Sequence, residues 1–427
     1  MNKIKITPTQ LFVVAFLLCG LMTIQTPAAP GNLDLTFGTG GKVITNLDSD
    51  EFAQKMAIQP DGKIVVSGLH LNYDGSHDKN FLVRYNPNGV LDTNFGTNGN
   101  VFIFVDGPTR ERSLYGLAIL PDGKILVSGS VYNPAAFKRD FAVFRFNSNG
   151  SRDASFGVNG VVSASVSGCS NDSGYTLQVQ PDGKIVVIGN IVNYSGCNES
   201  AGIGAVHFHA DGSLDTAFGT NGKLYFSIPL YIDKFSAPFH SALLPDGKLL
   251  LMSRTTGLSN GARTFLSRIN AKGTLDASFG TNGVLLPDQS ENDAFQFALQ
   301  PDGKIVLPMR KFPGNVTTQT TIFRFNPDGT PDASFGTIGI VVIPVSEGVF
   351  YRSVLVQPNG KILTAKSTTE NLDSSFATLR LNADGSRDAS FGTNGVVTTV
   401  MGPQGDQSQA VFSSRIRRLQ NRFAPCL

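Results

Sequence analysis

The chain has 427 residues, with 35 Lys and Arg against 33 Asp and Glu, a formal net charge of +2, and 41% hydrophobic residues. This apolar content excludes a disordered chain, and its frequent interruption by polar residues excludes a helical membrane bundle. The near-zero net charge argues against a nucleic-acid-binding protein, and the lack of Trp weakens the case for sugar recognition by aromatic stacking.

The first 29 residues have the pattern of a secretory signal peptide. Lys3 and Lys5 precede an apolar stretch over residues 11–24, which is followed by Thr-Pro-Ala-Ala over residues 26–29. This stretch of about 14 residues is shorter than the roughly 20 that are needed to span a bilayer. We expect cleavage near Ala28 and an exported protein that is secreted, periplasmic or on the cell surface. No later apolar run predicts an integral membrane segment after signal removal.

Two motifs recur along the rest of the chain. The first is Pro-Asp-Gly-Lys, which begins at Pro60, Pro121, Pro181, Pro245 and Pro301, with Pro-Asn-Gly-Lys from Pro358 as a sixth copy. The second is Asp-x-x-Phe-Gly-x-x-Gly, whose phenylalanines are Phe37, Phe95, Phe156, Phe218, Phe279, Phe335 and Phe391. Successive turn motifs are 56 to 64 residues apart, and the Gly and Pro residues within each unit exclude a long helical repeat.

Each unit contains the signals of four short strands in a constant order. In the first unit, a strand over 56–59 ends at the Pro-Asp-Gly turn, and strands over 64–66, 81–86 and 101–105 follow. Such a sheet has two apolar faces and can bury them only against neighbouring sheets, while a small residue such as Ala57 marks the first strand as the innermost. The repeats therefore predict an all-β protein, a β-propeller with four-stranded blades.

The number of units predicts six complete blades over residues 30–400. A leading fourth strand at 43–46 precedes them, and a seventh blade would need three more strands after Val400. The C-terminal tail, residues 401–427, has no Pro-Asp-Gly turn. We expect this tail to be a possible degenerate seventh blade, a disordered segment or the product of a shifted reading frame.

The linked motifs resemble the delta-60 repeat of bacterial exported and surface proteins. The resemblance rests on Gln-Pro-Asp-Gly-Lys-Ile-Val-Val, Phe-x-x-x-Arg-Tyr-Asn and Leu-Asp-x-x-Phe-Gly in a fixed order, and it covers roughly residues 33–400. It implies a β-propeller. It implies no established activity and no catalytic residue that could be assigned to this chain.

Each unit also repeats ionisable residues whose role could be structural or chemical. Asp residues in tight turns satisfy backbone amides, and they lack the alternating spacing of a calcium loop, so we interpret them as structural. The lysines that follow the turns could form a ring that binds an anionic polymer, although pairing with the turn carboxylates is favoured. We expect the third-strand arginines to pair between blades. In the third unit His207 and His209 replace this Arg and the following Asn, which allows a metal pair as the alternative to structural substitution.

Alternate residues of the innermost strands are predicted to line an axial channel. The candidates are Lys55, Gln59, Thr176, Gln178, His240 and Gln296. Lys55 and His240 are the ionisable members of this set, and no carboxylates converge with them to hold a metal or to act as paired acid and base. We therefore expect no catalytic residue, no metal and no cofactor.

Two hypotheses of function follow. The favoured one is an exported non-catalytic scaffold whose variable loops, at residues 70–80, 130–139, 190–204 and 308–320, bind an unknown protein or polysaccharide. The alternative is a secreted lyase or hydrolase with an axial pocket, in which His240 and Lys55 act as acid and base.

The cysteines predict one disulfide. Cys19 lies in the signal segment after the bulky Leu18, where lipoprotein processing requires a small residue, so a lipid anchor is disfavoured. Cys169 precedes the first strand of the third unit, and Cys197 lies in its second-to-third loop, so both are expected on one face of the disc. A Cys169–Cys197 bond would close a loop of about 28 residues and stabilise an exported protein by roughly 3 kcal/mol, with two free thiols as the alternative.

Overall fold

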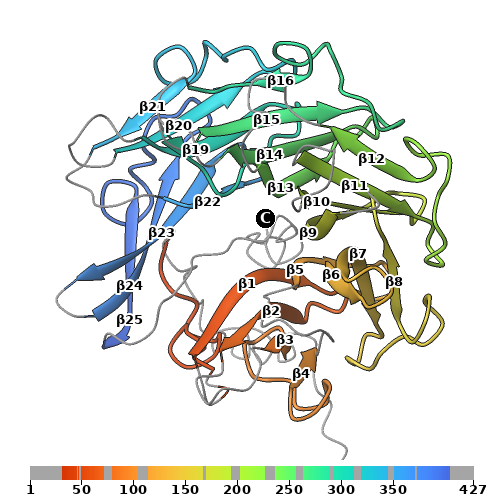
Figure 1. The fold of residues 1–427 in the computed structure, drawn as a ribbon. Helices are drawn as coiled ribbons and strands as arrows, with labels where there is room; N and C mark the ends of the chain where they lie inside the picture. The colour runs from red at the N-terminus through yellow and green to blue at the C-terminus, as the bar shows by residue number, and fades with distance from the viewer. Residues whose placement is uncertain are drawn as a thin grey trace, which may run out of the picture.

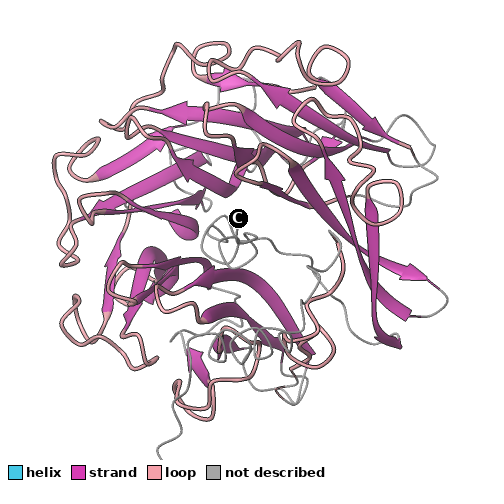
Figure 2. Ribbon diagram, turned by 180° about the vertical axis from the view of Figure 1, so that it is seen from behind, coloured by secondary structure: helices cyan, strands magenta, loops and turns pink. Residues whose placement is uncertain are grey.

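The computed structural model describes residues 31–45, 47, 50–71, 79–103, 114–166, 170–193, 202–226, 236–255, 263–288, 292–311, 319–344, 351–370 and 373–403. These residues form strands and turns and contain no helix, so none of the described segments could cross a membrane as a helix. The strands make six antiparallel sheets arranged in a ring, as both views show (Figures 1 and 2). The predicted all-β propeller with six four-stranded blades is confirmed.

Within each blade the strands follow the chain from the axis outward. Blade 1 contains β1 (Asp50–Ile58), β2 (Ile64–Leu71), β3 (Lys79–Tyr85) and β4 (Asn100–Ile103). Blade 2 contains β5 (Leu114–Ile119), β6 (Ile125–Asn133), β7 (Lys138–Phe146) and β8 (Val161–Ala164). Blade 3 contains β9 (Ser170–Val179), β10 (Ile185–Asn193), β11 (Gly202–Phe208) and β12 (Lys223–Phe226).

The other three blades repeat this order. Blade 4 contains β13 (Ser236–Leu243), β14 (Leu249–Thr255), β15 (Arg263–Ile269) and β16 (Val284–Leu285). In blade 5 the short strands β17 (Asn292–Asp293) and β18 (Ala298–Leu299) both pair with β19 (Ile305–Lys311), which β20 (Gln319–Phe325) and β21 (Ile340–Ile343) follow. Blade 6 contains β22 (Ser353–Val356), β23 (Ile362–Glu370), β24 (Asp373–Leu381) and β25 (Val396–Pro403).

The Pro-Asp-Gly-Lys motif forms the tight turn between the two inner strands. In blade 1 the amide of Gln59 donates to the Lys63 carbonyl at 2.8 Å, and the Gly62 amide donates to the Gln59 carbonyl at 2.9 Å. Gly62 has a φ of 86°, which glycine adopts without strain. The Asp61 carboxylate accepts from the Lys63 amide at 3.1 Å, so this turn carboxylate is structural, as the sequence predicts.

Neighbouring blades pack face to face through both faces of each inner strand. Ala57 and Val65 of blade 1 share one buried cluster with Ile119, Val127 and Phe144 of blade 2. The set of alternate residues that contains Ala57 was expected to face the channel. Ala57 itself packs against the next blade, whereas Gln59 of the same set, and Ala242 and Ala298 at the positions equivalent to Ala57, line an axial cavity.

The Asp-x-x-Phe-Gly segment joins each blade to the next. Phe95 is fully buried, and the amide of Gly96 donates to the carbonyl of Asn149 in blade 2 at 2.9 Å. Gly150, which follows Asn149 with a φ of 89°, lies so close that a Cβ there would be 2.9 Å from the Phe95 ring. The glycine of the third-to-fourth turn therefore leaves the space in which the phenylalanine of the preceding blade packs.

The seventh copy of this motif closes the ring. The amide of Gly38, beside Phe37, donates to the carbonyl of Asn88 in blade 1 at 2.7 Å. At the other end of the same segment, a Cβ on Gly31 would lie 3.1 Å from the ring of Phe391 in blade 6. Residues 31–45, which we call the closing segment, thus connect the last blade to the first (red in Figure 1). Seven motif copies in six blades are explained without a seventh sheet.

Several predictions from the sequence fall outside the described residues. The signal peptide at 1–29, Cys169, Cys197 and residues 404–427 of the tail belong to this group. Residues 401–403 are the end of β25, the outer strand of blade 6. The signal peptide, the disulfide and the nature of the rest of the tail stay predictions.

The closing segment generates a stability prediction. We expect Phe37→Ala to lower the free energy of unfolding, because it removes the ring that blade 1 receives across the closure. The loss should be smaller than the about 3–5 kcal/mol expected for Phe156→Ala, since Phe156 is fully buried whereas Phe37 is partly exposed. Urea denaturation of the two variants measures this order. An unchanged midpoint for Phe37→Ala would contradict a role for this segment in closure.

Candidate functional site

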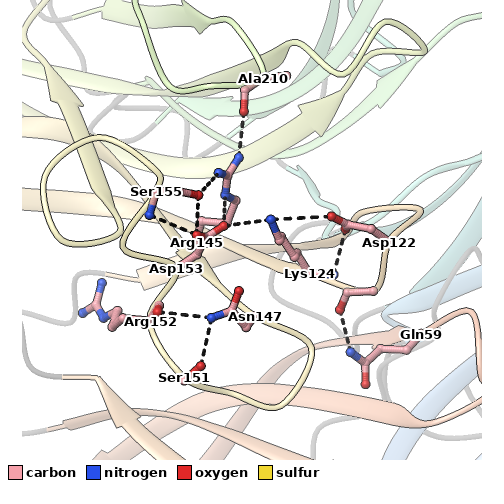
Figure 3. Close-up of polar contacts among 11 residues, drawn as sticks. Gln59, Asp122, Lys124, Arg145, Asn147, Ser151, Arg152, Asp153, Ser155 and Ala210 are labelled. Carbon is pink, nitrogen blue, oxygen red and sulfur yellow. Dashed lines mark hydrogen bonds and ion pairs between the residues drawn. The ribbon is translucent and has the colours of Figure 1, made fainter.

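A buried ionic node lies at every junction between blades, and blade 2 shows its geometry (Figure 3). Asp153, which begins the Phe-Gly segment, accepts from Arg145 Nε of β7 at 2.7 Å and from Lys124 Nζ of the turn at 3.1 Å. Its second oxygen accepts from the Ser155 hydroxyl at 2.6 Å. Arg145 Nη1 continues into blade 3, where it donates to the carbonyl of Ala210 at 2.7 Å. One arginine therefore connects the carboxylate of its own blade to the backbone of the next.

The same node recurs around the ring. The equivalent triads are Lys63–Asp92–Arg84, Lys248–Asp276–Arg268, Lys304–Asp332–Arg324 and Lys361–Asp388–Arg380. Each arginine also lies over the phenylalanine of the motif, with guanidinium-to-ring distances from 4.2 Å to 4.8 Å. The lysine ring that could have bound an anionic polymer thus pairs with buried carboxylates, and the predicted contact of arginine between blades is present.

Blade 3 substitutes histidine for arginine in this node. His207 Nδ1 lies 3.1 Å from Asp215 Oδ2, and Nε2 lies 3.1 Å from Gln180 Oε1. Burial leads the causes that lower the pKa of His207, so the ring is neutral at physiological pH. His209 Nε2 is 3.8 Å from the same carboxylate. No group of three His, Cys, Asp or Glu residues that could hold a metal occurs in the described part of the chain, and the geometry of His207 is that of a structural substitution.

The nodes hold their carboxylates ionised. Burial would raise the pKa of Asp153, but hydrogen bonds from Ser155 and Lys124 and the charge of Arg145 hold it well below its usual range. The hydrogen bond from Lys184 is the largest of the effects that lower the pKa of Asp215 to about 2. The nodes are therefore charged ion pairs over the whole physiological range.

Removal of one node arginine should lower the free energy of unfolding. We expect Arg145→Met to destabilise the fold by about 3–5 kcal/mol, because the buried Asp153 loses its principal partner and the Ala210 carbonyl loses its donor. Arg387→Met, at a half-buried arginine outside the nodes, is the control. Equal denaturation midpoints for the two variants would show that the node adds no stability.

The lowered carboxyl pKa values predict acid sensitivity only at low pH. A group whose pKa is lower in the folded than in the unfolded chain stabilises fully above the unfolded value, near 3.9, and loses this contribution as the pH falls through the folded value. The node aspartates with lowered pKa are Asp92, Asp153, Asp215, Asp276, Asp332 and Asp388. The aspartate contribution to the free energy of unfolding should be level from pH 7 to 5 and be lost steeply below about pH 4. The buried histidines His207 and His240 add a gradual loss of stability as the pH falls below about 6.5, because their pKa values are lower in the folded than in the unfolded chain. Denaturant titrations at each pH measure it, and cooperative unfolding already at pH 5 would contradict the prediction.

An axial cavity of about 1020 Å³ lies at one end of the channel, where the turn prolines contribute to its wall. Four of the predicted channel residues, Gln59, Gln178, His240 and Gln296, line it, whereas Lys55 and Thr176 are not in its wall. The rest of the wall is mostly apolar, including Ile58, Leu243, Phe297 and Val354. The cavity is therefore a largely apolar receptacle with a few amide groups.

The polar groups on the inner strands are used mainly to join one inner strand to the next. Gln59 Nε2 donates to the carbonyl of Gly123 at 2.7 Å, and Gln178 Nε2 donates to the carbonyl of Ser241 at 2.8 Å. The Thr176 hydroxyl bonds the Ser241 hydroxyl at 2.7 Å. The side-chain oxygen Oε1 of Gln296 accepts from the backbone amide of Val354 at 3.3 Å. These bonds stabilise the ring and engage one polar atom of each of these side chains.

Lys55 and His240 stand at equivalent positions of opposite blades and influence each other electrostatically. His240 Nε2 donates to the carbonyl of Phe297 at 2.9 Å, and the two rings meet edge to face at 4.6 Å. Burial and then the charge of Lys55 lower the pKa of His240 to about 3. Burial also lowers the pKa of Lys55. The imidazole is thus neutral at pH 7, with its one proton engaged by a backbone carbonyl.

Each inner strand also carries one extra residue, six positions before the turn proline. The six residues are Gln54, Tyr115, Tyr175, Phe239, Phe295 and Arg352. In blades 1 to 4 the register with the second strand shifts at this position. In blade 5, Asp293 pairs with Arg310 and Ala298 pairs with Val306. The inner strand therefore advances five residues while β19 advances four. In blade 6 two residues of the inner strand oppose Ala365: Ser353 pairs with it, and the amide of Arg352 donates to its carbonyl.

A β-bulge redirects the side chain of its extra residue. Here the residues on either side of the bulge pair with successive residues of the second strand, so the extra residue falls outside the regular alternation between the two faces of the sheet. We call these six positions the bulge ring. These positions are not among the residues predicted from the sequence, although alignment of the six turn prolines places an aromatic residue at four of them.

Comparison with known proteins supports the architecture. Residues 59–95, 120–156, 180–218, 244–279, 310–335 and 357–391 match the family described as "Domain of unknown function (DUF5122) beta-propeller". The chain is therefore a β-propeller repeat protein, with one match to this family in each blade. A search of curated protein sequences found no match.

Several solved structures are similar to this chain at low identity. A polysaccharide lyase of family PL25, an ulvan lyase, has a TM-score of 0.49 and 11% identity over 79% of this chain and 83% of its own. A protein of unknown function from Dyadobacter fermentans has a TM-score of 0.44 and 12% identity over 85% and 98%. The GH93 α-L-arabinofuranosidase of Fusarium graminearum has a TM-score of 0.44 and 12% identity over 88% and 96%.

Proposed function

We propose that this protein is an exported, non-catalytic β-propeller scaffold that binds an extracellular protein or polysaccharide. The observation that carries the proposal is that the polar side chains of the channel are hydrogen-bonded to the backbone of neighbouring blades. Gln59, Gln178 and His240 all line the cavity, yet each has its donor engaged by the backbone of the next blade. Groups held in this way form a rigid wall and are poorly suited to exchange protons with a substrate.

The repeated nodes support a scaffold role as well. A ring whose blades are joined by buried ion pairs keeps its loops in fixed relative positions, and binding residues are commonly carried on loops of such a frame. The loop at 130–139 includes Phe137, which is 83% exposed in the turn between β6 and β7. On the strength of the sequence motifs, we also propose that the protein is exported through its N-terminal signal. We propose likewise that its repeats are of the delta-60 type.

The alternative, a lyase or hydrolase that uses His240 and Lys55, is disfavoured by the state of His240. A general acid needs a proton that it can release to the substrate, and the proton of His240 is engaged by the Phe297 carbonyl. A general base is most effective with a pKa near the working pH, whereas the pKa of His240 is about 3. The neutral imidazole therefore has neither property at pH 7.

Turnover measurements test this proposal. The native protein and His240→Ala are incubated with polyuronate, sulfated and neutral polysaccharides, and new reducing ends and unsaturated uronates are measured. We expect no product above buffer from either protein, and binding to at least one member of a panel of glycans and extracellular proteins. Turnover by the native chain that His240→Ala abolishes without a change in melting temperature would overturn the scaffold proposal in favour of an enzyme.

A further inference from the structure

The apolar wall of the axial cavity comes from two levels of the inner strands. Two residues before the turn proline, the wall contains the aliphatic side chains of Ile58, Leu243, Leu299 and Val356. Three residues before the proline, blades 4 and 5 contribute only the small side chains of Ala242 and Ala298. The resulting volume of about 1020 Å³ is at the upper end of the roughly 300–1000 Å³ of small-molecule sites. The cavity is therefore large enough for an organic ligand with an apolar body.

No acidic side chain lines this cavity in the part of the chain that the structure describes, and His240 is the one titratable residue of the described wall. His240 and Gln296 mark the end of the cavity away from the turn prolines, five residues before the proline. We call this level the inner layer, and its six residues are Lys55, Gly116, Thr176, His240, Gln296 and Ser353. Lys55 is thus the basic residue of a layer that contains no Asp or Glu.

Lys55 differs from its equivalents because its side chain has no partner. Three other side chains of the inner layer each bond the next blade, in the pairs Thr176–Ser241, His240–Phe297 and Gln296–Val354. Within the described part of the chain, the Lys55 amine makes no hydrogen bond or ion pair. Its strand β1 lies across the axis from β13, which carries His240 (Figure 1), and its charge lowers the pKa of His240. The amine therefore lies near the inner end of the cavity without a counter-charge.

We propose that the axial cavity binds a small monocarboxylate with an apolar body, whose carboxylate pairs with Lys55. Contact of an aliphatic chain with Leu243, Leu355 and Val356 removes apolar area from water. The carboxylate supplies the counter-charge that the amine lacks, in a charge-assisted hydrogen bond. One amine matches the single charge of a carboxylate, whereas a phosphate dianion would keep an unpaired charge among apolar side chains. The inference goes beyond the proposed scaffold function, because it concerns the axial cavity and not the loops.

Calorimetric titration with three matched probes tests the proposal. Octanoate has the apolar body and the charge, octanamide has the same shape without the charge, and acetate has the charge without the body. We expect octanoate to bind, octanamide to bind about tenfold more weakly, and acetate to bind roughly a hundredfold or more weakly. Absence of octanoate binding at millimolar concentration, or equal affinities for octanoate and octanamide, would overturn the proposal.

Substitution of Lys55 should remove the preference for the charged probe. We expect Lys55→Met to weaken octanoate binding about tenfold and to leave the affinity for octanamide unchanged. Lys55→Arg, which keeps the charge, should recover part of the affinity for octanoate. Lys272→Met is the matched control, at an exposed lysine in the turn between β15 and β16. A preference for octanoate that persists in Lys55→Met would contradict the role of this amine.

Variants that fill the cavity test its place as the binding site. We expect Ala298→Leu and Ala242→Leu each to weaken both octanoate and octanamide about tenfold, because the larger side chain takes up cavity volume. Leu355 occupies the equivalent position of blade 6, so the frame accepts a leucine there. Ala118→Leu, at the equivalent position of blade 2 and outside the described wall, is the matched control. Thermal melting shows that each variant is folded.

Affinities that neither cavity-filling variant changes would place the probes elsewhere and overturn the axial site. The scaffold function is tested separately, by the panel of glycans and extracellular proteins, so failure of the axial site leaves that result unaffected.

Discussion

The insertion of a Phe-Gly segment into the turn of the next blade is the constraint on which the whole ring depends. A four-stranded sheet with two apolar faces is not stable alone, so each blade must be held at a set angle to its neighbours. Phe95, Gly150 and the node below them provide this contact in one place. The aspartate begins the segment and accepts a hydrogen bond from the lysine of the turn. It also pairs with an arginine that extends into the next blade. Turn, segment and third strand are thus coupled through a single carboxylate.

This coupling explains why the motifs always occur together and why there is one more segment than there are blades. A closed ring of six blades has six junctions, and the chain must enter and leave at one of them. Gly31 and Gly38 lie on opposite sides of that junction, so the closing segment supplies the connection that the covalent chain provides elsewhere. Closure here is made by a motif rather than by a strand shared between the first and last sheets.

The same architecture determines where chemistry is possible near the axis. Inner strands that face neighbouring blades on both sides use their polar side chains across the junctions, as Gln59 and Gln178 do. The bulge frees one residue per blade from this alternation. Its composition varies from Gln54 to Tyr115 to Arg352, whereas the Lys–Asp–Arg node recurs in five of the six blades. Variation on a constant frame is what a binding surface requires, and Phe295 and Arg352 are exposed at these positions.

The sequence alone determined the fold class, the number of blades, the order of strands and the structural role of the turn aspartates, because these follow from local turn chemistry and repeat spacing. It also placed the arginines between blades. It did not determine the direction of the channel residues, since two-residue periodicity distinguishes the faces of a strand but not its edge. His240 looked like an available base in the sequence, yet burial and the Phe297 carbonyl make it neutral and engaged. The pairing of Tyr115 with Tyr175 and of Phe295 with Arg352 depends on register shifts and on contacts between blades, which only the tertiary structure decides.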